Sequence, residues 1–130
     1  MLPTKILLIS ADDSISGSVI TCLQQTGYKV IHYSLGANVM DIIHVEKLSL
    51  IILDMELPDF NSLAIIQSLR SEELSNGIPV ILMGSNMREE DVLIGLEVGA
   101  DLCLLETFHP QVFVARVCSL LHRTESLKIQ

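Results

Sequence analysis

Short apolar runs and stretches with helical signals alternate five times along this sequence, and that alternation constrains the fold more than any other feature. The apolar runs cover residues 5–9, 29–33, 50–53, 80–83 and 102–105. The run 50–53 is apolar on both faces, as a strand at the centre of a parallel sheet requires. Since strand–helix–strand units cross over with the right hand, this order predicts an α/β domain with a doubly wound, five-stranded parallel sheet and helices on both faces.

The segments between these runs contain start and stop signals for helices. The predicted helices cover about 14–25, 38–45, 61–70, 86–99 and 110–123. Gly27 follows the first of them as a helix-terminating residue, Asn61 caps the third, and Pro110 begins the last. Asn86, with Glu89 three residues later, is the pair expected to cap the fourth.

A single domain accounts for all 130 residues, with a core over about 5–123 and the start of a linker or tail at 124–130. Hydrophobic residues make up 49% of the chain, which excludes intrinsic disorder, and the apolar runs are too short to span a membrane. Acidic residues outnumber basic ones by 16 to 8, which argues against nucleic-acid binding by this domain. Because the cysteines are scattered and no signal-peptide pattern opens the chain, we expect a cytoplasmic protein.

Acidic residues follow two of the apolar runs. The first run leads into Asp12 and Asp13, the third is followed directly by Asp54, and Glu56 lies two residues further on. Because sites in open α/β sheets form at the carboxyl ends of the strands, we expect these acids to converge. Asp13 alone is as readily a helix cap, but neighbouring carboxylates repel one another and need a cation, a proton or solvent between them. Oxygen ligands suit Mg²⁺, so the set predicts a divalent-metal site.

The order and spacing of several motifs make the chain resemble the receiver domain of two-component response regulators. The motifs are residues 6–9 leading into Asp12 and Asp13, together with 50–59, 79–83, 99–101 and 108–110. The resemblance implies a flavodoxin-like, three-layer sandwich that receives a phosphoryl group from a histidine kinase or a phosphotransfer protein. It further implies that Asp54 is the phosphoacceptor. Asp12, Asp13 and the backbone of Glu56 would hold Mg²⁺, or another divalent cation, with it.

The chain departs from that family's pattern at the residues that operate the switch. The threonine or serine at the end of the fourth strand is replaced by Gly84, with Ser85 next to it, and the aromatic residue of the fifth strand by Cys103. The lysine and proline that follow the fifth strand are replaced by Glu106 and Thr107. Exchanging lysine for glutamate turns an attraction of about 4 kcal/mol into a repulsion, so we expect weakened or altered switching.

These residues leave three functions open. In the first, Asp54 accepts a phosphoryl group with Mg²⁺, and self-phosphorylation and dephosphorylation are the domain's only chemistry. In the second, the chain is a pseudo-receiver that binds proteins whatever its phosphorylation. It would dock an effector or a second copy through the last two predicted helices and the strand between them, where Leu93 or Val98 is exposed. In the third, the acids serve another chemistry, but a haloacid-dehalogenase-type phosphatase needs aspartate at Glu56 and a cobalamin site needs histidine at Ser14.

Overall fold

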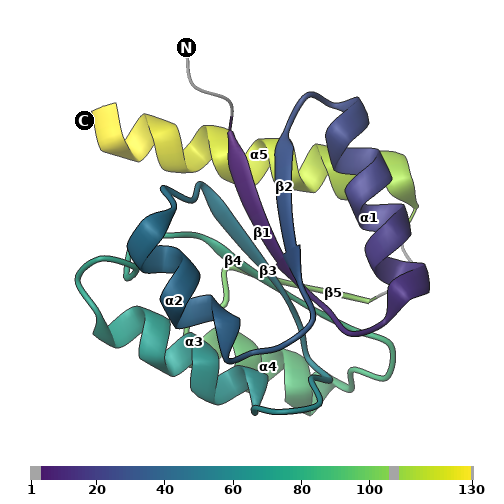
Figure 1. Ribbon diagram of the computed structural model, residues 1–130, viewed down its shortest axis with the longest axis vertical. Coiled ribbons are helices and arrows are strands. Elements are labelled where there is room, and N and C mark those ends of the chain that lie inside the picture. Colours follow the sequence, from purple (N-terminus) through teal and green to yellow (C-terminus); the bar gives the residue numbers. More distant parts are fainter. Residues whose placement is uncertain (1–3, 106–108, 130) are drawn as a thin grey trace.

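The computed structural model describes residues 4–105 and 109–129, with side chains described as far as Thr124. Within these residues five strands and five helices alternate along the chain, as the sequence predicts (Figure 1). The elements are β1 (Lys5–Ile9), α1 (Asp13–Gln25), β2 (Lys29–Tyr33), α2 (Asn38–Val45), β3 (Leu50–Asp54), α3 (Ser62–Ser71), β4 (Val80–Gly84), α4 (Glu89–Val98), β5 (Leu102–Leu105) and α5 (Pro110–Ile129). Of the described helices, none combines the length and the hydrophobicity needed to cross a membrane.

All strands of the sheet run parallel, in the order β2-β1-β3-β4-β5. Figure 1 shows α1 and α5 on one face of the sheet and α2, α3 and α4 on the other. The prediction of a doubly wound, flavodoxin-like α/β sandwich is therefore confirmed. Because the strands share one direction, the carboxyl ends of β1, β3 and β4 meet at one edge of the sheet, where open α/β sheets place their sites.

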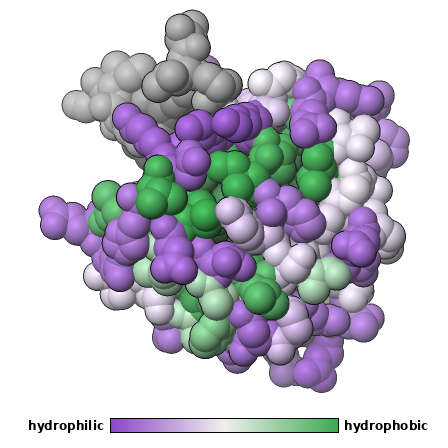
Figure 2. Space-filling view, viewed as in Figure 1, coloured by the Kyte–Doolittle hydropathy of each residue, from purple (hydrophilic) through white to green (hydrophobic). Residues whose placement is uncertain are grey.

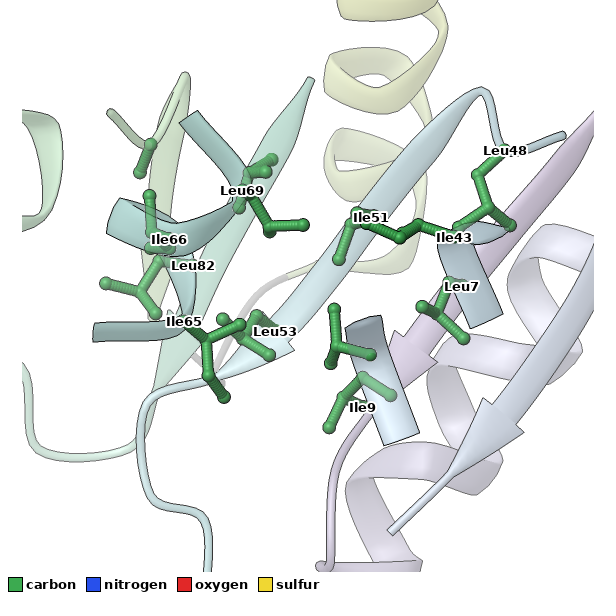
Figure 3. Close-up of a cluster of buried hydrophobic side chains, with 13 residues drawn as sticks. Leu7, Ile9, Ile43, Leu48, Ile51, Leu53, Ile65, Ile66, Leu69 and Leu82 are labelled. Atoms are coloured by element: carbon green, nitrogen blue, oxygen red, sulfur yellow. The ribbon is translucent and has the colours of Figure 1, made fainter. Parts of the chain in front are cut away.

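Alternate residues of the central strands pack into two hydrophobic clusters, one on each face of the sheet. Leu7 and Ile9 of β1 join the cluster against α2 and α3 (Figure 3), whereas Ile6 and Leu8 join the cluster against α1 and α5. These four side chains are at most 1% exposed. Burying each contributes about 1.5–3 kcal/mol, and burial on both faces explains why the central strands are continuous apolar runs.

The edge strand β2 is covered less completely than the strands at the centre of the sheet. Its residues Val30 and Ile31 are only half-buried. Figure 2 shows hydrophobic side chains gathered across the face on which β2 lies in front, between α1 and α2. The polar residues of this strand, Lys29 and His32, accord with its incomplete burial at the edge of the sheet.

The fourth helix begins at Glu89 rather than just after Asn86. Met87 packs against the end of β4, and this contact keeps the preceding loop out of the helix. The backbone N–H of Arg88 donates to Asp91 Oδ2 at 2.9 Å, which is the capping interaction that the structure contains. The predicted capping pair of Asn86 and Glu89 is therefore wrong.

The last helix is longer than the sequence analysis predicts. It continues through Ile129, beyond the expected end near Arg123 and into the segment expected to begin a linker or tail. No glycine or proline follows Pro110 in the sequence, so the chain contains no residue that would stop the helix there.

Candidate functional site

Asp54 ends β3 at the carboxyl edge of the sheet and is 5% exposed. Its Oδ2 accepts a hydrogen bond from Ser10 Oγ at 3.0 Å, and its Oδ1 accepts one from the backbone N–H of Glu56 at 2.9 Å. Burial raises the pKa of Asp54, the charges of Glu56 and Asp12 add to that effect, and the two hydrogen bonds oppose it. The result is a nearly buried carboxyl whose two oxygens both have donors from the protein.

Ser10, the residue that follows β1, contacts Asp54, and the acidic motif in the sequence does not predict this contact. In the parallel pairing of β1 with β3, Ile9 lies opposite Leu53. The next residue on each strand is Ser10 and Asp54, so the register itself brings these two side chains together. Working out the strand register would have revealed this contact, whereas reading the acidic motif alone does not.

Asp12 lies two residues after Ser10 in the sequence and caps the N-terminus of α1. Its Oδ1 accepts hydrogen bonds from Ser14 N at 3.1 Å, Ser14 Oγ at 2.8 Å and Ile15 N at 3.4 Å. The hydroxyl of Ser14 and the backbone N–H of Ile15 lower the pKa of Asp12. Asp13 is the exposed first residue of the helix rather than its cap. Ser10 and Ala11 separate this acidic pair from β1, which ends at Ile9 as the sequence predicts.

Glu56 contacts the loop after β4 through its side chain, while its backbone N–H donates to Asp54. The Glu56 side chain is exposed, and its Oε1 accepts a hydrogen bond of 3.5 Å from Ser85 Oγ of the loop after β4. Asp12, Asp54 and Glu56 thus each have donors of their own. Within the described residues, no three His, Cys, Asp or Glu side chains are grouped so that they could hold a metal ion. Separate hydrogen bonds hold these acids in place, while the charges of Glu56 and Asp12 still raise the pKa of Asp54.

Gly84, the last residue of β4, is buried beneath Met87. A Cβ at this position would lie 2.6 Å from Met87 Cγ and 3.4 Å from Met55 Cβ. The methionine therefore fills the space in which a longer side chain at position 84 would project. The neighbouring Ser85 is exposed, and its hydroxyl contacts Glu56 rather than Asp54.

Cys103 lies in β5, half-buried against α4. Its Sγ is 3.8 Å from the carbonyl oxygen of Val92, and a Cβ at Gly95 would lie 3.1 Å from the same sulfur. Burial raises the pKa of this thiol, which makes it a packing residue and not a reactive one. Glu106 and Thr107, the other two departures that the sequence analysis singles out, lie outside the described residues.

The parallel sheet of this order, with Asp54 at the end of its third strand, has the fold of CheY-like receiver domains. The chain belongs to the response regulator receiver domain family, whose model matches residues 6–118. It is 34% identical over 126 residues to the transcriptional regulatory protein GltR of Pseudomonas aeruginosa, covering 97% of this chain and 52% of that protein. It is 33% identical over 121 residues to the alkaline phosphatase synthesis transcriptional regulatory protein PhoP of Bacillus subtilis. That match covers 93% of this chain and 50% of PhoP.

The chain spans about half the length of the curated relatives that it matches. Among solved structures, a CheY-like receiver domain protein from Methanospirillum hungatei superposes with a TM-score of 0.88 at 22% identity, covering 96% of this chain and 98% of that one. The fold is thus that of receiver domains, and the family assigns the chain to two-component signal transduction rather than to an enzyme family.

Receiver domains generally bind Mg²⁺ for phosphorylation, so the residues around Asp54 can be compared with what such an ion needs. Mg²⁺ requires oxygen ligands in octahedral geometry, usually with one or two carboxylates among them. Here the residue that meets Asp54 from β1 is the neutral Ser10, and the carboxylate of Asp12 caps a helix. The side chains as the structure arranges them do not fit the ion.

Proposed function

We propose that this receiver domain acts in a two-component pathway by binding partner proteins, and that its response does not depend on a phosphoryl group at Asp54. The observation that supports this proposal is the Ser10 hydroxyl, 3.0 Å from the Asp54 carboxylate. Phosphoryl transfer to a carboxylate is catalysed mainly by positioning and by neutralising the charge of the phosphoryl oxygens. A neutral hydroxyl that already donates to Asp54 supplies no such neutralisation.

The charges around Asp54 also oppose phosphoryl transfer. Glu56 and Asp12 are close enough to raise the pKa of Asp54. A like charge about 6 Å from the incoming phosphoryl group opposes its transfer by about 3 kcal/mol at an effective dielectric of about 20. Glu106, where the family has a lysine, adds a further acid to the sequence at the end of β5.

Two more positions of the family's switch lack the side chains that operate it. Gly84 has no hydroxyl to bind a phosphoryl oxygen, and Met87 packs over it. Cys103 has no aromatic ring whose rotation could report phosphorylation, and it is held against the carbonyl of Val92. The usual mechanical link between Asp54 and the surface formed by α4, β5 and α5 is therefore missing in this chain.

That surface, which we call the α4–β5–α5 face, is the one we propose for partner binding. It exposes several large hydrophobic side chains: Leu93 (59%), Ile94 (43%), Leu96 (45%), Leu105 (51%) and Val112 (49%). Leu105 and Val112 also line a hollow of 320 Å³ between β5 and α5. Exposed apolar residues grouped beside a hollow are typical of protein interaction sites.

The charges on the α4–β5–α5 face favour a second copy of this chain as the partner. The first turn of α4 contains Glu89, Glu90 and Asp91, whereas α5 contains Arg116 and Arg123. In a two-fold dimer each surface meets itself in reverse, so the acidic helix of one copy can lie against the basic helix of the other. Such complementary charges fix the orientation of two surfaces that hydrophobic contacts hold together.

The experiment is sedimentation over a range of concentrations for the wild type, Leu93→Asp and Leu74→Asp. Leu74 is the matched control because it is as exposed as Leu93, at 59%, but lies outside the proposed face. We expect the wild type and Leu74→Asp to dimerise with rising concentration, and Leu93→Asp to remain monomeric. A wild type that stays monomeric throughout, or two variants that weaken association equally, would contradict the proposed surface.

The second candidate function is phosphoryl acceptance on Asp54, as the family resemblance implies. Its support is the position of Asp54, which ends β3 at the carboxyl edge and keeps 5% of its surface exposed. In this function a histidine kinase or a phosphotransfer protein is the donor, and Asp12, Asp13 and the Glu56 backbone are the proposed ligands of Mg²⁺. In this function Asp12 would bind the ion while its Oδ1 accepts three hydrogen bonds at the start of α1.

A further inference from the structure

The Ser10 hydroxyl lies on the side of Asp54 from which a cation ligand on β1 would reach it. Ser10 is 2% exposed, and its Oγ is 3.0 Å from Asp54 Oδ2, while the Glu56 backbone N–H takes Oδ1. Both carboxylate oxygens are therefore hydrogen-bonded by neutral donors. These two hydrogen bonds favour the charged carboxylate, although burial still raises its pKa.

Ser10 is held in place by bonds from several parts of the chain. Its backbone N–H donates to the carbonyl oxygen of Tyr33 at 3.1 Å, and its own carbonyl oxygen is 3.0 Å from His32 Nε2. The backbone N–H of Asp12 lies 3.2 Å from Ser10 Oγ and donates to it. Because Oγ accepts that bond, its own proton is left for Asp54. The hydroxyl thus has one arrangement that satisfies all of its neighbours.

Asp12 and Glu56, the other acids that could bind a cation beside Asp54, already accept hydrogen bonds from other groups. Asp12 Oδ1 accepts hydrogen bonds from two groups of Ser14 and one of Ile15 at the start of α1. The Glu56 carboxylate lies on the other side, 3.5 Å from Ser85 Oγ. A divalent cation beside Asp54 would therefore have one carboxylate and a neutral hydroxyl as its ligands, where hard cations are bound by several charged or carbonyl oxygens.

We propose that Ser10 excludes divalent cations from the Asp54 pocket, and that this one side chain determines the property. An aspartate at position 10 would bring a second carboxylate against Asp54 with no donor between them, and two such carboxylates attract a cation. Ser10→Asp is thus expected to create a metal site that the natural sequence lacks. This inference does not rest on the proposed partner surface.

The test is a Mn²⁺ titration of the full chain labelled with ¹⁵N, followed by paramagnetic broadening of amide signals. We expect the wild type to show no saturable broadening at Asp12 and Glu56, whose backbone N–H groups donate to Ser10 Oγ and Asp54 Oδ1. Ser10→Asp is expected to show saturable broadening at those amides, and competition by Mg²⁺ should reverse it. Ser10→Asn is the matched control because its side chain has nearly the shape of aspartate without the charge, and it should behave as the wild type does.

Two results would overturn the inference. The first is saturable broadening in the wild type that Asp54→Asn abolishes, since it would place a cation at the natural pocket. The second is a Ser10→Asp variant with a native amide spectrum and no broadening. If that variant fails to fold, the wild-type titration with its Asp54→Asn control decides the matter alone. A cation site in the wild type would leave the sedimentation result for the α4–β5–α5 face unaffected, so the two failures are distinguishable.

Discussion

Gly84 and Met87 pack so closely that the end of β4 has no room for a side chain. A Cβ at position 84 would lie 2.6 Å from Met87 Cγ and 3.0 Å from its Sδ. Real Cβ atoms do not approach other heavy atoms so closely, so any larger residue must displace the methionine. The glycine and the methionine therefore form one packing unit.

We predict that Gly84→Ala destabilises the fold by about 1–3 kcal/mol because the methyl group overpacks the contact with Met87. Adding Met87→Ala should recover part of that loss, since coupled neighbours are not additive. Urea unfolding of the two single variants and the double variant measures both effects. Gly77→Ala is the control because a Cβ there would meet nothing within 4 Å. Equal unfolding midpoints for Gly84→Ala and Gly77→Ala would contradict the packing argument.

Of the two residues that meet at the end of β1 and β3, Asp54 could be predicted from the sequence and Ser10 could not. Asp54 itself could be predicted because it ends the most apolar run and two acids lie near it in the sequence. Ser10 could not be predicted from residue type, because a serine after a strand is common and has no charge to draw attention. Its role depends on the register of β1 against β3, where Ile9 faces Leu53. A register depends on the packing of both strands and not on either motif alone.

At the scale of the elements, the start of α2 is capped from another part of the chain. Its own N-cap residue, Ala37, has no side chain able to accept a hydrogen bond. Instead Asp59, in the loop after β3, accepts from Gly36 N at 2.9 Å and from Ala37 N at 3.0 Å. Burial raises the pKa of Asp59, but the hydrogen bonds from Ala37 and Gly36 outweigh it and hold the pKa below its ordinary value. The loop next to Asp54 is thereby tied to α2.

We predict that Asp59→Asn lowers the midpoint of thermal unfolding by a few degrees at neutral pH, because one amide oxygen cannot serve both N–H groups. Since the pKa of Asp59 is lowered by folding, its contribution is fully present above the ordinary aspartate pKa of about 3.9 and is lost as the pH falls through the folded-state value. The difference from the wild type should therefore shrink in acid. Thermal unfolding monitored by circular dichroism at neutral and acidic pH measures it.

The matched control for this prediction is Glu73→Gln, which neutralises an exposed acid outside the loop. It should leave the unfolding midpoint nearly unchanged at both pH values. Faster amide exchange at Gly36 and Ala37 in Asp59→Asn alone would locate the effect at the start of α2. A loss of stability in Asp59→Asn that is the same at neutral and acidic pH would contradict a role for the charge.

Elements were more predictable than the contacts between them. The central strands β1, β3 and β4 were evident from their apolar runs because burial on both faces leaves almost no polar position in the centre of the sheet. The start of α4 was not, because the packing of Met87 on the end of β4 delays the helix, and no local capping signal records that contact. The cap of α2 was missed for the same reason, since Asp59 lies 22 residues from Ala37 in the sequence.

At the scale of the whole molecule, the fold of a receiver domain is kept while the chemistry around its acceptor position is changed. The chain matches the family over residues 6–118, and the sheet presents Asp54 at the edge where the family's site lies. Yet Ser10 faces that residue, and the acids nearby are bound to other donors. The fold of the family is therefore compatible with the proposed function, in which the domain signals through its surface.

The central claim is that the domain's response does not depend on a phosphoryl group at Asp54. It rests on the inference that Asp54 does not accept one, which intact-mass spectrometry tests most directly. The full chain and its Asp54→Asn variant are incubated with Mg²⁺ and a saturating small acyl-phosphate donor, beside a receiver domain known to be phosphorylated as the positive control. The account predicts a phosphoryl adduct on the positive control and identical, unmodified masses for the wild type and the variant. A phosphoryl adduct on the wild type that is absent from Asp54→Asn would contradict it.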